Sequence, residues 1–547
     1  MENTGRKKIK KGVPRGNTAI FAIMVSNLII LLGRLLFSGL LDEIGLGYYA
    51  AVYEMFVFIL LILSWYIPQA EAKVVRARIA KGQFKNADRV LKATLMFGGG
   101  IGLVLCLLEV ALAKVVAEKL LLQPLTALAL WIIAPAILLS IFISAYRGYF
   151  EGMGTTVPTN ISRILEQIFA LGFGLIFGRT FYNYGEKIGD LVQNINYAPA
   201  YAVAGIICGI VMAQLFVLLF LIFINRMYAS TFKKQLSKDN SKILDSYSEI
   251  MKNVFLSGIP HIFYLLLVQG IVYVNMLLYI QYVGKNTMQN YTVHYGSFYG
   301  KYCVIIGICV CLLSLTMEKP LAAITHYHKR EEYRAVKDIF AGAFHTFGIY
   351  GIPMSVFLAA LAEPITNMFF EKANGTVFLL QVSSSLIFLI PCALFFTYTL
   401  QLLEKQRKAL INCAVAFSVQ LVATMLFLHV MHFGIASVAY GYMICFGLMA
   451  ILNGMSVLRY LKYSPEYIRM FAIPLLASGI AGILDMLLAR AMLEKAGGMI
   501  TSIVCIILGC IGYVALLFAL KGVNEKELSK ISGGKWLGNL GKILHLF

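Results

Sequence analysis

The sequence predicts an all-α polytopic membrane protein with about 14 transmembrane helices, arranged as two pseudo-symmetric six-helix lobes followed by two C-terminal helices. Of its 547 residues, 59% are hydrophobic and only 14% are charged. A soluble chain of this length would expose more charge and would divide into several cores. Apolar runs of about 20 residues, long enough to cross a bilayer as helices, recur from one end of the chain to the other.

The first apolar run follows a basic arm at residues 1–16. The run is too long for a signal peptide and lacks a small-residue cleavage site, so we interpret it as the first span, with the amino terminus inside. The predicted spans in chain order are 17–41, 46–70, 91–115, 123–146, 158–179, 199–225, 253–283, 296–317, 338–362, 376–402, 409–430, 434–458, 468–490 and 499–520.

The net charge of +20 raises the alternative of a nucleic-acid partner. However, most Lys and Arg residues lie in the connections after even-numbered spans, and few lie after odd-numbered ones. Such a bias is typical of cytoplasmic loops in membrane proteins. We therefore expect a multi-pass membrane protein with both termini cytoplasmic and no nucleic-acid partner.

Two basic connections share a pattern at an offset of about 250 residues, with Pro68 and Lys81 in one and Pro320 and Lys329 in the other. An offset of six spans keeps the two copies parallel, because six is even. The predicted units are a basic cytoplasmic arm (1–16), an N-lobe (17–225), a cytoplasmic linker (226–252), a C-lobe (253–458), spans 13 and 14 (459–520) and a basic cytoplasmic tail (521–547).

The segment 147–158 joins the fourth and fifth predicted spans. Its three glycines supply backbone freedom, and Pro158 suits the first position of a new helix. We therefore predict a cytoplasmic turn over this whole segment, with Glu151 as a solvated loop charge.

No motif in the chain predicts an enzyme. The ten cysteines are scattered through apolar runs, without zinc-ligand spacing or a disulfide framework. The glycine-rich segment 98–102 lies inside an apolar run and lacks the Lys-Ser/Thr of a phosphate loop, so it indicates close helix packing. Because we find no ATP-binding motif and expect no cofactor, the energy for transport would come from an ion gradient (Na⁺ or H⁺), the membrane potential or a substrate gradient.

A family resemblance rests on the same turn. Residues 147–153 read RGYFEGM, and VPT at 157–159 and EQ at 166–167 follow. This pattern resembles the bacterial polysaccharide biosynthesis proteins and, more closely, the stage V sporulation protein B group, relatives of the lipid II flippases in the multidrug/oligosaccharidyl-lipid/polysaccharide exporter superfamily. The segment GLGYY at 45–49 and the Ile-Pro pair at 67–68 agree with it.

The resemblance implies a V-shaped transporter whose central cavity is lined by spans one, two, seven and eight. Such proteins move undecaprenyl-linked saccharides across the cytoplasmic membrane by alternating access, and in the lipid II flippases several cavity arginines meet the pyrophosphate. We therefore expect an undecaprenyl-linked saccharide lipid and membrane lipids as partners, a monomer, and roles in peptidoglycan or polysaccharide biosynthesis, including sporulation.

Four candidate substrate-binding residues lie in the first two spans. Arg34 is deep in the first span, where a cation is costly unless it faces water or a partner. The structural alternative is a pair with Glu54, which could also carry a proton, or snorkelling of Arg34 towards the interface. Tyr49 and Tyr53 are four residues apart, so they share one helix face that suits a sugar ring, although tyrosines are also common at membrane interfaces.

The other candidates come from spans seven and eight, which would face Arg34 from the second lobe. The seventh span contains His261, Gln269 and Asn275 within an apolar run, and the eighth contains Lys301 soon after Tyr299. A lone histidine such as His261 also fits a hydrogen-bonded packing role. In the fifth span, Arg163 and Glu166 are three residues apart on one helix face, and we interpret them as a structural pair.

Two transport functions remain open from the sequence. The leading one is a flippase for an undecaprenyl-linked saccharide or a lipid II-type precursor. The alternative is a cation-coupled multidrug exporter of the same superfamily, which would use a membrane-embedded acid such as Glu54 or Glu166. A membrane glycosyltransferase would need a catalytic acid pair or a long outer loop, and a scaffold would not need Arg34.

Overall fold

The computed structural model describes residues 18–60, 66–237, 239, 244–286, 291–370 and 375–523. Within these ranges the chain is helical and contains no β-strand. Thirteen helices are long and apolar enough to cross a membrane, and a bent helix pair makes a fourteenth span. The predicted fold class is therefore confirmed.

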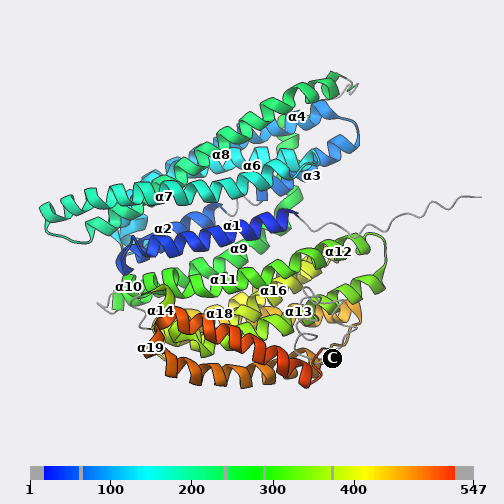
Figure 1. Cartoon of the computed structure of the whole chain (residues 1–547). Coiled ribbons are helices and arrows are strands. Elements are labelled where there is room, and N and C mark those ends of the chain that lie inside the picture. Colours follow the sequence, from blue (N-terminus) through cyan, green and yellow to red (C-terminus); the bar gives the residue numbers. More distant parts are fainter. Residues whose placement is uncertain are drawn as a thin grey trace, which may run out of the picture.

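The first half of the bundle contains the helices up to α8 (Figure 1). Helix α7 packs along α8, α6 packs on α8, α3 and α5 pack on α6, and α1 packs on α7. The bounds are α1 Thr18–Ser38, α2 Glu43–Leu60, α3 Ile67–Ala80, α4 Phe84–Ala93, η2 Thr94–Gly98, α5 Gly99–Val115, η3 Val116–Leu120, η4 Pro124–Thr126, α6 Ala127–Gly152, α7 Val157–Val192 and α8 Tyr197–Ser237.

The second half is built around α13, α16 and α18. Helices α16 and α17 pack on α18, α9 packs on α17, and α12 and α16 pack on α13. The bounds are α9 Tyr247–Asn286, α10 Tyr291–Ser297, η5 Phe298–Tyr302, α11 Cys303–Ser314, η6 Leu315–Met317, α12 Glu318–His328, α13 Tyr333–Ala360, α14 Ala362–Phe369, α15 Thr376–Ser383, α16 Leu386–Leu402, α17 Gln406–His429 and α18 Ala436–Leu461. The tenth span, predicted as one helix over 376–402, is bent by 51° between α15 and α16.

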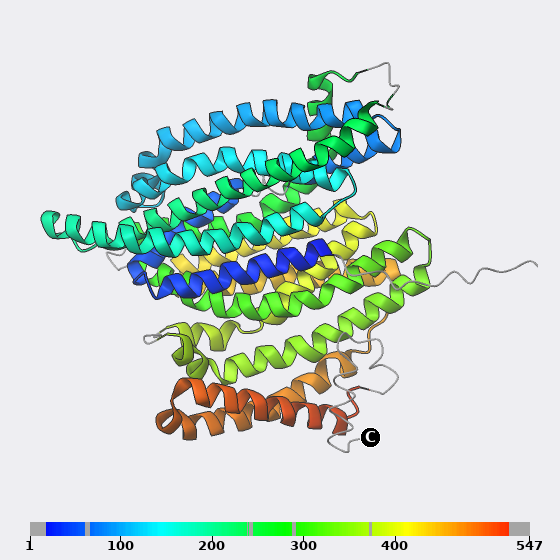
Figure 2. The ribbon, with the colours of Figure 1, turned by 45° about the horizontal axis from the view of Figure 1, so that its top comes forward.

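The last two spans lie beside the second half, as Figure 2 shows in orange and red. They comprise the π-helical turn η7 (Ile468–Ala472) and α19 (Ile473–Ala519). At Gly497 the backbone has φ of 74°, a left-handed conformation that glycine adopts without a steric penalty. This break divides α19 into two spans, which pack on α13 and α14.

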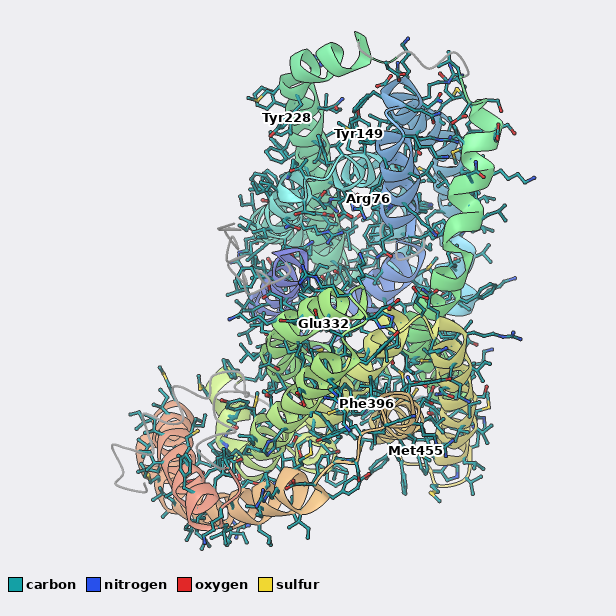
Figure 3. The ribbon with its side chains drawn as sticks, turned by 90° about the vertical axis from the view of Figure 1, so that its right-hand side faces the viewer. Arg76, Tyr149, Tyr228, Glu332, Phe396 and Met455 are labelled. Carbon is teal, nitrogen blue, oxygen red and sulfur yellow. The ribbon has the colours of Figure 1, made fainter. Side chains whose placement is uncertain are left out.

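One end of the bundle carries the short helices α3, α4 and α12, and we call it the basic end. Pro68 lies near the start of α3 and Pro320 near the start of α12, so the two related connections have the same form. Figure 3 views this end, with Arg76 and Tyr149 in the first half and Glu332 in the second. The opposite end carries α10 and the start of α2 (Figure 1).

The segment 147–158 is shorter as a turn than predicted. Helix α6 continues to Gly152, and α7 begins at Val157 with Pro158 in its first turn. Only Gly154 has a positive φ, of 89°. A Cβ at Gly148 would lie 2.9 Å from the Pro68 backbone, and one at Gly152 would lie 2.5 Å from Val75. These two glycines therefore serve close packing of α6 on α3, which the turn prediction did not anticipate.

Glu71 on α3 is a fully buried carboxyl outside the membrane-spanning segments, and neither of its oxygens makes a hydrogen bond to another described residue. Burial raises the pKa of Glu71 well above its usual range, and the nearby Thr94 hydroxyl opposes only part of this rise. The folded state therefore binds more protons than the unfolded chain at any pH between the ordinary carboxyl pKa and the raised one. The free energy of unfolding falls as pH rises through that window.

We expect the variant Glu71→Gln to lose this pH dependence, because an amide has no proton to release. We compare the thermal unfolding midpoints of the variant and the parent protein in detergent. The variant should have the higher midpoint, and the difference should be larger at pH 8 than at pH 5. The exposed Glu363 supplies a control, Glu363→Gln, with the same offset at both pH values. An equal offset at pH 5 and pH 8 for Glu71→Gln would contradict the prediction.

Candidate functional site

Arg34 lies four residues before the end of α1, where the two halves of the bundle meet. Its guanidinium Nη2 is 3.6 Å from Glu54 Oε1, and its Cζ lies over the rings of Tyr299 at 4.1 Å and Tyr53 at 5.3 Å from the ring centroids. The side chain is only 13% exposed. Its Nε makes no hydrogen bond to any residue that the structure describes. Arg34 is therefore a mostly buried cation whose Nε has no hydrogen-bond partner among the described residues.

Glu54 holds this cation from α2 and also contacts the second half. Gln269 on α9 donates from Nε2 to Glu54 Oε2 at 3.0 Å. The pair of Arg34 with Glu54, which the sequence left open as the structural alternative to substrate contact, is thus observed, and Gln269 lies at the same place. A contact of these residues with substrate stays a prediction.

Aromatic rings enclose the Arg34 guanidinium. Tyr49 and Tyr53 stack at 5.3 Å with 25° between their planes, as expected for one helix face. Tyr49 also lies 6.3 Å from Tyr299 and makes an edge contact with Phe37 at 5.8 Å. Tyr49 is almost fully buried beside these residues. In this conformation its ring is therefore not accessible to a sugar.

Tyr299 reaches Arg34 from η5, a π-helical turn within the eighth span. The sequence indicated only that Tyr299 was one of several polar groups in that span. A π-turn inserts one extra residue into the helix, so every following side chain points in a different direction. The Arg34 cluster, which we define as Arg34, Tyr49, Tyr53, Glu54, Gln269 and Tyr299, thus combines α1 and α2 with α9 and η5.

The remaining candidates lie elsewhere in this structure. The fully buried Asn275 accepts a hydrogen bond from Gln420 Nε2 on α17 at 2.5 Å, within the second half. Lys301 Nζ is 2.6 Å from Glu43 Oε1, at the first residue of α2. Glu43 and Glu54 are eleven residues apart, about 16 Å along the helix axis. The side chain of His261 lies outside the described residues.

The predicted Arg163–Glu166 pair is corrected by the structure. Glu166 Oε2 is 2.7 Å from Arg147 Nη2, and Arg147 Nε donates to Ser162 Oγ at 2.8 Å. Arg163 Nη2 lies 3.7 Å from Glu151 Oε1. Glu151 is half-buried, so the prediction of a solvated loop charge is wrong. Because α6 continues past residue 147, it brings Arg147 inside the bundle opposite α7, and the carboxylate of Glu166 compensates that buried charge.

Removing one partner of the Arg147–Glu166 pair should cost far more than removing both. Glu166→Ala leaves the Arg147 guanidinium buried without its carboxylate, and we expect the free energy of unfolding to fall by about 3–5 kcal/mol. The apolar double variant Arg147→Met/Glu166→Leu should lose much less, since it leaves no buried charge. Thermal unfolding in detergent tests this, with the exposed-pair variant Lys92→Ala as a control that changes little. A double variant as unstable as Glu166→Ala would contradict the expectation.

Two hollows lie near these charges. A cavity of about 90 Å³ between α1, α2, α7 and α8 is lined by apolar side chains together with Tyr49, Tyr53, Glu166, Gln167 and Gln214. A larger open groove of about 580 Å³ at the basic end follows one face of α3, with Lys73, Arg76 and Glu151 at its walls. The groove at the basic end is therefore lined by two cations, whereas the cavity within the first half has Glu166 as its charged lining residue.

A bundle of apolar helices whose buried polar cluster lies between two halves has the architecture of a membrane transporter, and the comparisons agree with this class. A family model described as polysaccharide biosynthesis protein matches residues 17–315. The chain belongs to the polysaccharide biosynthesis protein family. Stage V sporulation protein B of Bacillus subtilis (strain 168) is 27% identical over 133 residues, a match that covers 24% of this chain and 26% of that protein.

Solved structures of transporters share the fold. The lipid II flippase MurJ in an inward closed conformation has a TM-score of 0.60 at 13% identity, covering 91% of this chain and 97% of that one. An inward-facing multidrug resistance MATE family transporter of the MOP superfamily has a TM-score of 0.58 at 14% identity, covering 82% and 97%. These similar proteins are transporters or flippases rather than enzymes, and at this identity they support the fold.

Proposed function

We propose that this protein is a flippase that moves an undecaprenyl-linked saccharide or a lipid II-type cell-wall precursor across the bacterial cytoplasmic membrane by alternating access. The observation that carries the proposal is Arg34, a buried cation with an unused Nε donor, held between the two halves of a polysaccharide biosynthesis protein. A headgroup with anionic phosphates has to cross about 30 Å of hydrocarbon, and a buried cation lowers that barrier.

The composition of the Arg34 cluster supports alternating access. Arg34 and Glu54 belong to the first half, whereas Gln269 and Tyr299 belong to the second. A movement of one half against the other would separate Tyr299 from Arg34 and break the Gln269–Glu54 hydrogen bond, so the guanidinium would become accessible to an anion. The same movement would leave the lipid tail outside, in the bilayer. We further propose that the protein acts as a monomer and that the basic end is cytoplasmic, because Lys and Arg gather there.

The second candidate is a cation-coupled multidrug exporter. It is favoured by the similarity to a multidrug resistance MATE family transporter and by the acids inside the bundle. However, Glu54 lies beside Arg34, and Glu166 is bonded to Arg147. Each of these carboxylates is compensated by a protein cation, which leaves little negative charge for a cationic drug. Arg34 is itself paired with Glu54, so the preference for an anionic substrate rests on the unused Nε donor of Arg34.

Depletion of the protein in its host separates the two candidates. We expect an undecaprenyl-linked intermediate to accumulate on the inner side of the membrane, as measured by mass spectrometry of extracted lipids. Re-expression of the parent chain should remove the accumulation, whereas the Arg34→Ala variant should not. If no such lipid accumulates and the depleted cells instead retain a cationic dye, the flippase proposal is wrong and the exporter takes its place.

A further inference from the structure

The two legs of α19 enclose a carboxyl group where they pack together. The first leg (473–496) and the second leg (498–519) lie side by side on either side of the break at Gly497, as Figure 2 shows in orange and red. Asp485 and Gly509 are each twelve residues from this break, about 18 Å along each leg and deep in a hydrocarbon layer of about 30 Å. A Cβ at Gly509 would overlap Asp485 Oδ2. The carboxyl group therefore lies directly against the backbone of the second leg.

Asp485 has no partner for a negative charge among the residues that the structure describes. It is only 3% exposed, its Oδ2 makes no hydrogen bond, and it forms no ion pair with a described Lys, Arg or His. Glu54 and Glu166 differ in this respect, because an arginine lies beside each of them. The carboxyl group of Asp485 is thus buried without the compensation that those two acids have.

Apolar packing surrounds this carboxyl group. Ala481 and Ala489, one turn before and one turn after Asp485 on the first leg, are both almost fully buried. On the same face, α13 packs against Gly482 through Val356. An ionised carboxylate is costly in such a place without a counter-charge or water, whereas the neutral acid can be accommodated. Asp485 therefore fits this packing in its protonated form.

The neighbouring helices offer no positive charge in place of the proton. Their ionisable side chains near this packing are Arg490 on the first leg, Cys505, Cys510 and Tyr513 on the second, Tyr350 on α13 and Glu363 on α14. Tyr513 donates its hydroxyl to the Ile349 carbonyl, and Arg490 and Glu363 are exposed. The groups that face Asp485 from the second leg are therefore thiols, which cannot compensate a carboxylate.

The geometry points to Asp485 as a proton-binding site that controls the packing of the last two spans. With the proton bound, the neutral carboxyl group lies against Gly509 and the two legs pack closely. When the proton passes to water, the carboxylate that remains needs water or a cation beside it, and the contact with Gly509 leaves no space for either. The legs then separate. This site is distinct from the Arg34 cluster, to which α19 contributes no residue.

Infrared spectroscopy of the purified full-length protein tests the protonation directly. At pH 6 the parent should show a carbonyl band of a protonated carboxylic acid that is absent from Asp485→Asn and that shifts in heavy water. The exposed acid Glu363 supplies the control, because Glu363→Gln should leave this band unchanged. Identical carboxylic acid bands in the parent and Asp485→Asn would mean that Asp485 is ionised, and the assignment would be overturned.

Two native cysteines on the second leg report separation of the legs. Cys505 is fully buried, whereas Cys510 is exposed and serves as an internal reference for the pH dependence of thiol reactivity. The protein is treated with membrane-permeant N-ethylmaleimide, and modification of each cysteine is quantified by peptide mass spectrometry. The ratio of Cys505 to Cys510 modification should rise several-fold from pH 6 to pH 9 in the parent. In Asp485→Asn it should stay low, because the amide cannot ionise.

Two further variants distinguish loss of the proton from loss of packing. Asp485→Ala removes the carboxyl group altogether, so its ratio should also stay low at pH 9. Gly509→Ala places a Cβ against the carboxyl group and should raise the ratio at both pH values. A ratio that rises equally in the parent, Asp485→Asn and Asp485→Ala, or that stays flat in the parent, would overturn the link between this proton and the packing. Neither readout uses a lipid substrate, so the result is independent of the proposed function.

Discussion

Replacing Arg34 with alanine is expected to lower the flipping rate of a fluorescent lipid II in proteoliposomes by about 100-fold or more. The variant loses the charge-assisted contact with the headgroup phosphates in a site that is shielded from water. Arg34→Lys should retain an intermediate rate, because it keeps the charge but loses the planar guanidinium that lies over Tyr299 at 4.1 Å. Complementation of a depleted strain should follow the same order.

A double variant separates a binding role of Arg34 from a purely structural one. Arg34→Ala leaves Glu54 buried without its counter-charge, so the loss could reflect an unstable protein. Arg34→Ala/Glu54→Gln restores neutrality and should recover thermal stability. If the double variant also regains transport, Arg34 serves only to compensate Glu54 and its assigned role is wrong. An exposed arginine of the basic end, replaced in Arg407→Ala, should leave the rate unchanged.

Substituting Gly296 should have the second large effect, because no side chain fits where α10 crosses α2. A Cβ at this position would overlap the Glu43 carbonyl oxygen. Gly296→Val should hold the two helices apart and abolish transport. In the same protein, a cysteine introduced by Thr292→Cys should stay accessible to a membrane-impermeant maleimide. Gly296→Ala should give an intermediate flipping rate and intermediate labelling. Flipping rate and labelling are measured on the same preparations.

The control for Gly296 is a glycine in open space. A Cβ at Gly447 on α18 would have nothing within 4 Å, so Gly447→Ala should leave labelling unchanged and stabilise its helix by about 0.5–1 kcal/mol. If the Gly296→Val variant transports normally and its cysteine reacts with maleimide no faster than that of the parent, close contact of α10 with α2 is not needed for transport.

The sequence predicted most of the fold and named five of the six residues of the Arg34 cluster as candidates. Apolar length and the alternation of basic connections indicated fourteen spans, and the depth of Arg34 within one of them indicated an unusual charge. Tyr49 and Tyr53 could be placed on one face from their spacing alone. Tyr299 could not be assigned to Arg34, because it lies within a π-turn and hydropathy carries no signal for such a turn.

The prediction for segment 147–158 failed for a related reason, because local sequence does not show which helix lies beside it. Its glycines suggested a turn, and the motif was useful for recognising the family. In the structure those at 148 and 152 allow α6 to approach α3, and Arg147 becomes a buried partner of Glu166. Glycine at close helix packing and glycine in a turn have the same sequence signal, and only the neighbouring helix distinguishes them.

The sequence by itself determined the features that the bilayer requires along the chain, namely the spans and the sidedness of their connections. Each span must be mainly apolar and helical, and the connections must carry their basic residues on the correct side, so both can be read one residue after another. The tertiary structure decided which side chains meet. The pairs Gln269–Glu54 and Lys301–Glu43 join residues 215 and 258 positions apart. Such contacts depend on the rotation and tilt of each helix against its neighbours, which packing sets and local sequence does not.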